Sequence, residues 1–438
     1  MFYNYLKIMR TFHLLILLLI FGTVNAQKML TLEDAVNIAL KNNYDILVAR
    51  NDADIAKANN TAGNAGMLPT LEVIGSGSAG LSNVSQKLST GNINNYPLLS
   101  STSINAGTEL SWSLFDGGKM FITKSKLNEI QSLGKIQFKE RVLQTQFEII
   151  ATYYDVVKQK QQLKSINEVI SFNRERVKIT ETGFNAGYFL KSDLLQSKID
   201  LNVAMSNAIN QQYAIDAAKK LLNNLLGQKA DSDFEVSDSI PLNYSPNKDE
   251  LVQKLNSSNT SILTYQKQID IATLALKENK TNYLPTINLN GGYYFSQNTN
   301  SAGSTLQNSS FGPQIGGNIT IPLYSAGENK RKVTTAKLDL QSAEYNLQNV
   351  SLQAHTDLDN AFSDFENQKQ LLKIEEENNQ LTKENLEISL QRLRLGQTTS
   401  LEVHQAQEFY IQSFTRLTNI RYNLKIAESK LKQLIASF

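Results

Sequence analysis

Apolar and polar residues alternate with a period of two in four stretches of about ten residues. In the clearest stretch the even positions carry Ile104, Leu110 and Trp112, while the odd positions are polar or small. This alternation predicts strands with one apolar and one polar face, and ten residues is the length that a tilted strand needs to cross a bilayer. The strands are expected at about 69–79, 103–115, 284–296 and 313–323.

The expected strands favour a transmembrane barrel with apolar residues outside and polar residues inside. The polar segments 77–103 and 296–312 are then expected as loops. Four strands cannot close around water, and open sheet edges are not tolerated in lipid. Other copies of the chain must therefore supply strands. Three copies would give twelve strands. The pattern requires other copies of the chain, but it fixes their number less firmly. A soluble four-strand sandwich stays open as the alternative.

A different pattern, with a period of seven, follows the first pair of strands. Apolar residues recur at Ile149, Val156 and Ile170, and the same columns return 209 positions later. A sustained seven-residue repeat predicts helices that wrap around one another. The stretch 119–183 would make a helix about 100 Å long, which suits the wall of a hollow tube. An ordinary coiled-coil dimer or a spectrin-like bundle is the alternative.

Glycines at 187 and 396 are expected to end these long helices in short loops. The returning helices are then Asp193–Leu226 and Leu401–Ile435, with Ser192 and Ser400 as candidate N-caps. Two shorter helices are expected before the strands. They span 31–66, with a capping signal at Thr31 and Asp34, and 247–282.

The chain contains an internal duplication. Residues 43–76 match 259–292 at an offset of 216, and later segments match at 209. We expect two similar halves, each with a helix, two strands and two further helices. The predicted organisation is repeat 1 at 31–227, a linker at 228–246 and repeat 2 at 247–436.

The first 26 residues are typical of a secretory signal. Lys7 and Arg10 precede the apolar run Leu14–Phe21, and cleavage is expected after Ala26. The 43 basic residues lose two with the signal, which leaves them equal in number to the 41 acidic residues. No basic run indicates nucleic-acid binding. With no cysteine, disulfides and thiolate metal sites are excluded.

No catalytic or cofactor motif was found in the sequence. The mature chain has two histidines, His355 and His404, which are expected to be exposed helix residues. Neither an enzyme nor a metal or cofactor site is therefore predicted.

Together these features resemble the TolC-like outer-membrane efflux proteins. The resemblance rests on the duplicated plan, the Leu-Pro-Thr strand entries at 68–70 and 284–286, the Leu-Phe-Asp-Gly-Gly strand exit at 114–118, and a glycine followed by an acid at each helix hairpin. It implies a mainly helical homotrimer with a transmembrane β part: a twelve-strand barrel in the Gram-negative outer membrane, continued by a twelve-helix tunnel in the periplasm.

The resemblance also implies a function and partners. The channel would passively conduct small molecules (drugs, toxic compounds, metals) or polypeptides. A periplasmic adaptor would join it to an inner-membrane transporter of the resistance-nodulation-division or ABC type. A secreted coiled-coil scaffold or adhesin without channel activity is the alternative.

The resemblance finally implies two kinds of site. An acidic constriction would include Glu402 and, one turn on, Gln405, where the family carries a second acid; Asp193 either reinforces this gate or only caps a helix. The adaptor would contact the hairpin loops. Their residues are Gly187, Tyr188, Phe189, Leu190, Gly396, Gln397, Thr398 and Thr399.

Overall fold

The computed structural model describes residues 29–438 and divides into two compact units. We call them the helical unit (29–49, 139–259 and 353–438) and the strand unit (50–138 and 260–352). The predicted signal at 1–26 lies outside the described residues.

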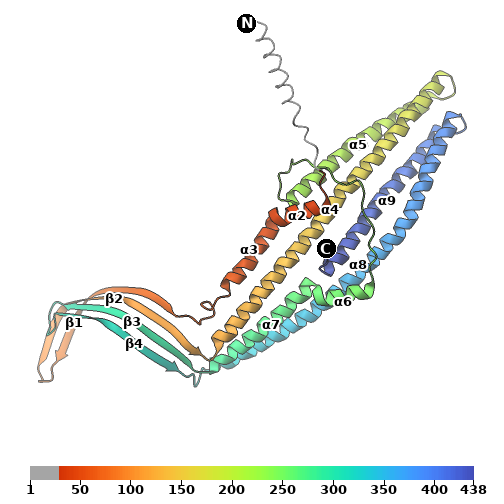
Figure 1. Cartoon of the computed structure of the whole chain (residues 1–438). Coiled ribbons are helices and arrows are strands. Elements are labelled where there is room, and N and C mark those ends of the chain that lie inside the picture. Colours follow the sequence, from red (N-terminus) through yellow and green to blue (C-terminus); the bar gives the residue numbers. More distant parts are fainter. Residues whose placement is uncertain (1–28) are drawn as a thin grey trace, which may run out of the picture. The chain divides into compact units, whose positions relative to one another are not determined.

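The strand unit contains one antiparallel sheet, in which the strands lie side by side in chain order (Figure 1). Each strand pairs with the next, so β1 and β4 form the two edges. The strands are β1 (Thr70–Lys87), β2 (Ile93–Asp116), β3 (Thr286–Asn300) and β4 (Gln307–Thr320).

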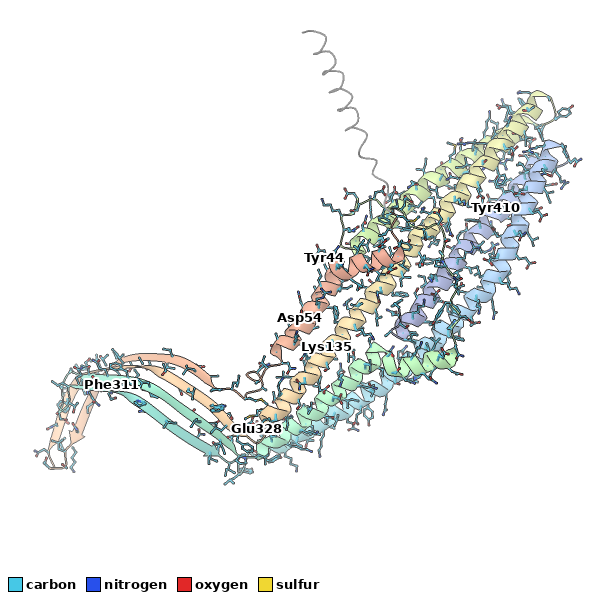
Figure 2. The ribbon with its side chains drawn as sticks, viewed as in Figure 1. Tyr44, Asp54, Lys135, Phe311, Glu328 and Tyr410 are labelled. Carbon is cyan, nitrogen blue, oxygen red and sulfur yellow. The ribbon has the colours of Figure 1, made fainter. Side chains whose placement is uncertain are left out.

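The register sorts the residues of the sheet into two faces. Leu71, Leu110, Gly291 and Ile315 are successive cross-strand partners and form one row of the apolar face. Directly opposed residues lie on the same face, and the neighbouring residues of each strand lie on the other. Phe311 also belongs to the apolar face and is 75 % exposed (Figure 2). The alternation predicted from the sequence is therefore present.

The strands are longer than the sequence indicated. β1 and β2 continue through most of 77–103, and β3 and β4 through much of 296–312. The prediction of loops there was wrong over most of their length. Glycine, serine and asparagine disfavour strands only weakly, and the cross-strand ladder outweighs that preference.

Two helices of 67 residues, α4 (Lys119–Asn185) and α8 (Glu328–Arg394), contribute to both units. Within the helical unit each lies beside a returning helix of 35 residues, α5 (Lys191–Leu225) or α9 (Ser400–Leu434) (Figure 1). The predicted long helices are confirmed. Among the described residues, no helix is long and apolar enough to cross a membrane.

The expected seam is buried along much of its length. In α4, Ile149 and Val156 are buried, and in α8 so are Leu358, Phe365 and Leu386. Near the end of α4 the seam changes, because Val177 is half-buried and Phe184 is exposed. Polar residues take the buried positions in that part of the helix, as described below.

Each predicted shorter helix is broken by an asparagine. The first divides into α2 (Leu32–Asn42) and α3 (Tyr44–Asn59), and the second into α6 (Lys248–Ser258) and α7 (Thr260–Lys280). At both breaks, Asn43 and Asn259, the backbone is extended and the side-chain amide donates to the carbonyl of Leu225 or Leu434, respectively. The asparagines thus satisfy carbonyls that a helix end leaves free.

Candidate functional site

The loop between α4 and α5 is held in shape by glycines. Gly187 has a φ of +80°, the left-handed conformation that ends many helices. The N–H groups of Gly187 and Tyr188 donate to Phe184 and Gly183 at 3.0 and 2.7 Å. The ring of Phe189 covers Gly183 so closely that a Cβ there would clash with it. Tyr188, between Gly187 and Phe189, is 85 % exposed.

The loop between α8 and α9 repeats this geometry. Gly396 has a φ of +69°, and its N–H donates to Leu393 at 3.1 Å. The N–H of Gln397 donates to Arg392 at 2.9 Å, and the Arg392 guanidinium donates back to the Gln397 carbonyl at 3.1 Å. Beyond Gly396 itself and its two chain neighbours, no described atom lies within 4 Å of where a Cβ of Gly396 would be. The space beside Gly396 is therefore open.

The caps of the returning helices differ from those predicted. Ser192 and Ser400 are not N-caps, because α5 and α9 begin at Lys191 and Ser400, so that Leu190 and Thr399 precede them. Asp193 accepts from the N–H of Leu190 at 3.1 Å. The capping predicted at Thr31 is confirmed, since its hydroxyl accepts from the N–H of Asp34 at 3.1 Å.

Of the three candidate gate residues, Asp193 and Glu402 lie on the first turns of α5 and α9, and Gln405 lies on the second turn of α9. Glu402 is exposed, accepts from the hydroxyl of Thr398, and lies 3.9 Å from an Arg392 nitrogen. Thr399 is the N-cap of α9, and its hydroxyl accepts a hydrogen bond from the N–H of Glu402 at 3.3 Å. Gln405 is exposed, whereas Asp193 is half-buried by its capping position. The carboxylate of Glu402 is therefore exposed to solvent, with the exposed Arg392 guanidinium at the limit of ion-pair distance.

A buried polar cluster that the sequence did not reveal lies further along the hairpins. Arg176 of α4 is 1 % exposed and forms an ion pair with Asp200 of α5, which is 8 % exposed. Gln196 donates to the other carboxylate oxygen at 2.8 Å, and Asn173 donates to the Asp200 carbonyl at 3.3 Å. Buried charges persist only when paired in this way.

His404 joins this cluster from α9. Its Nδ1 lies 3.2 Å from Asp200 Oδ2. The prediction that both histidines are exposed was wrong, because His355 and His404 are half-buried. The Nδ1 atom of His404 is itself buried and makes no hydrogen bond. His404 and Asp200 both line a groove of about 400 Å³ between α4, α5 and α9, with Ile166, Val203 and Phe414 among its apolar walls.

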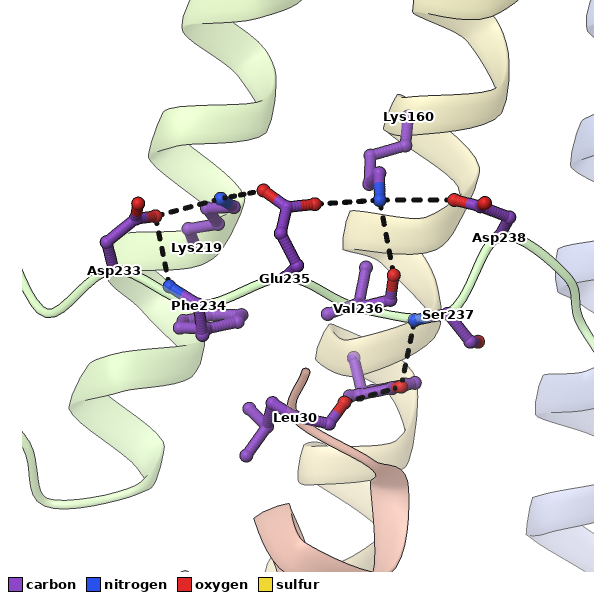
Figure 3. A network of polar contacts seen from close by, with 10 residues as sticks. Leu30, Lys160, Lys219, Asp233, Phe234, Glu235, Val236, Ser237 and Asp238 are labelled. Atoms are coloured by element: carbon purple, nitrogen blue, oxygen red, sulfur yellow. Dashed lines mark hydrogen bonds and ion pairs between the residues drawn. The ribbon is translucent and has the colours of Figure 1, made fainter. Parts of the chain in front are cut away.

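The linker at 228–246 is fixed to α4 and α5 by a network of charges (Figure 3). Lys219 contacts Asp233 and Glu235, each at 3.1 Å, and Lys160 contacts Glu235 at 2.9 Å. The hydrogen bond from Lys160, together with Lys219, lowers the pKa of Glu235. Neutralising Glu235 would weaken the attachment. In the part of the chain that the structure describes, no three acidic or histidine side chains converge to hold a metal.

A sequence profile of the outer membrane efflux protein family matches residues 35–228 and 251–437. The chain belongs to this outer membrane efflux family. The protease secretion protein PrtF of Dickeya chrysanthemi is 20 % identical over 404 residues, covering 89 % of this chain and 84 % of PrtF. TolC of Vibrio cholerae is 19 % identical over 293 residues, covering 66 % of this chain and 67 % of TolC.

The fold of this efflux family protein also matches a solved channel. The outer membrane channel CmeC of Campylobacter jejuni superposes with a TM-score of 0.73 at 19 % identity, covering 92 % of this chain and 85 % of CmeC. At that identity the likeness establishes the fold alone. The resemblance inferred from the sequence motifs is confirmed, whereas the roles of single residues are not tested by it.

Proposed function

We propose that the protein is a passive export channel of the Gram-negative outer membrane, working as a homotrimer of two similar halves per chain. The observation that supports this proposal most strongly is the sheet, whose two faces differ in polarity. Its edge strands β1 and β4 have no further strand partner among the described residues. A closed barrel with lipid outside and water inside satisfies both features.

The helices supply a second reason for other copies. Ile374, Leu381 and Ile388 recur every seven residues along α8 and are between 48 and 63 % exposed. A heptad seam of this kind is stable when another helix covers it. The returning helix α5 carries its own exposed apolar residues, which are Leu195, Ile199, Val203, Ile209 and Tyr213. Three copies would bring twelve strands into one barrel and twelve long and returning helices into one tunnel.

The hairpin loops support the proposed gate and docking surfaces. Three copies of Glu402 would place a ring of carboxylates at the tunnel end, and Gln405 would add a neutral ring one turn away. Asp193 already caps α5, and we give it a supporting role in the same ring. The open loop surfaces at 187–190 and 396–399 would receive a periplasmic adaptor that leads to an inner-membrane pump. Secretion and efflux relatives leave the cargo open between small molecules and polypeptides.

The channel and its gate are tested together in planar bilayers. We expect the purified trimer to insert, conduct and prefer cations, because a carboxylate ring attracts them and repels anions. Glu402→Gln should raise conductance and weaken that preference, whereas Glu344→Gln, an exposed position on α8, should change neither. Unaltered selectivity in Glu402→Gln removes the gate assignment. A trimer that stays soluble without detergent and never conducts removes the channel and favours the scaffold.

Docking at the second loop is tested by two replacements of one glycine. Gly396→Trp should abolish export in cells while the trimer remains intact, because the indole would occupy the open surface against which the adaptor packs. Gly396→Asn is the control, since asparagine tolerates the left-handed backbone at a φ of +69°. Export that continues normally with tryptophan would disprove docking at this loop, and loss with both variants would indicate only a misshapen turn.

A further inference from the structure

Three helices meet at one buried carboxylate. Arg176 of α4 pairs with Asp200 of α5, and His404 of α9 brings its Nδ1 to 3.2 Å from the same oxygen, Oδ2. Asp200 thus connects the hairpin α4–α5 to a helix of the hairpin α8–α9. Arg176 and Asp200 have side chains 1 % and 8 % exposed, whereas His404 is 34 % exposed and borders the groove. Water and protons therefore have access to the imidazole but little to the other two groups.

The protonation state of His404 decides how strongly it is attracted to Asp200. Nδ1 is buried and takes part in no hydrogen bond. A neutral imidazole carries a single N–H, on Nδ1 or on Nε2, so it offers Asp200 at most an uncharged donor. A second ring proton makes the imidazole a cation and converts the same geometry into an ion pair across the two hairpins, at low solvent exposure, where charge pairs are strongest.

The other charges around His404 come from each helix that packs there. On α9, Glu402 precedes it by two residues, and Glu408 follows one turn later and lines the same groove. On α4, the positive charge of Arg176 disfavours a positive charge on His404, but Arg176 is already paired with Asp200. Glu168, also on α4, accepts a hydrogen bond from the Tyr410 hydroxyl at 2.8 Å. On α8, the adjoining buried residues are the leucines Leu386, Leu390 and Leu393. The charge of Glu387, also on α8, interacts electrostatically with Tyr410.

We propose that His404 is a proton-operated clamp between the two hairpins. Imidazoles take up a proton between about pH 8 and 5. The protonated ring gains its attraction to Asp200 only while α9 stays against α5, so acid favours the packed arrangement and alkali weakens it. In an acidic periplasm the hairpin ends would therefore open less readily. This consequence for transport rests on the proposed channel function.

The clamp is tested first by thermal unfolding of the full chain in detergent, which does not depend on conduction. Acidification from pH 8 to 5.5 should raise the midpoint of the wild type relative to His404→Gln, which cannot take up a proton. His404→Lys carries its charge at both pH values, and its midpoint should shift with pH no more than that of His404→Gln. His355→Gln, the other histidine of the described chain, is the matched control and should retain the wild-type response.

Open probability in planar bilayers then tests the consequence for the channel. We expect it to fall about fivefold or more in the wild type between pH 8 and 5.5, and to stay level in His404→Gln. A wild-type pH response that persists in His404→Gln, or that disappears in His355→Gln, overturns the clamp. Absence of any conduction, with the thermal shifts as expected, overturns only the channel proposal.

Discussion

Arg176→Met is expected to destabilise the helical unit by about 3–5 kcal/mol, because it leaves a buried carboxylate without its counter-charge. Asp200 is 8 % exposed, and its other direct donor is the neutral amide of Gln196. Methionine has nearly the length of arginine, so the packing loss is small and the electrostatic loss dominates. The measurement is the midpoint of thermal or chaotrope unfolding in detergent, followed by helix circular dichroism.

A double variant separates charge from packing. Arg176→Met combined with Asp200→Leu removes both ions, and replacing a buried pair with apolar residues of similar volume is often neutral or stabilising. We therefore expect the double variant to recover most of the lost stability, although it no longer offers a partner to His404. If the double variant is as unstable as Arg176→Met alone, the lost stability comes from the packing of these side chains and not from the buried charge.

This cluster also shows why the sequence did not reveal the whole site. The seven-residue seam predicts Val177 and Phe184 as the buried positions near the end of α4, but the buried residues there are Asn173, Arg176 and Thr180. Each finds a partner on α5, which offsets part of the cost of its burial. A pattern of apolar residues cannot indicate a polar interior whose partners lie on another helix. Only the pairing across the hairpin identifies it.

The breaks at Asn43 and Asn259 have a similar cause. Nothing in the local pattern distinguishes them from other asparagines in helices, and continuous helices were the natural expectation. The break arises because each side chain reaches a free carbonyl at the end of a distant helix, at 2.8 and 2.9 Å. The long helices and the alternation of the strands were predictable because both depend on periodicity within one segment.

Ile315→Arg is expected to prevent stable insertion, and it tests the lipid-facing assignment directly. Ile315 is 82 % exposed near the middle of β4, on the apolar face opposite Gly291. An arginine at the bilayer midplane of a barrel costs about 2–4 kcal/mol. Each trimer would bear this cost three times. The measurement is the amount of folded trimer recovered from outer membranes and from refolding into lipid vesicles.

The adjacent residue provides the control. Gln314 lies on the polar face, where its cross-strand partner is Gly292 and the next residue in that row is Glu109. An arginine there would meet water and a carboxylate, so Gln314→Arg should insert nearly as well as the wild type. If the chain were instead a soluble scaffold, both positions would be surface sites, where substitutions usually cost less than about 0.5 kcal/mol. Equal recovery of the two arginine variants would then show that neither face of the sheet contacts lipid.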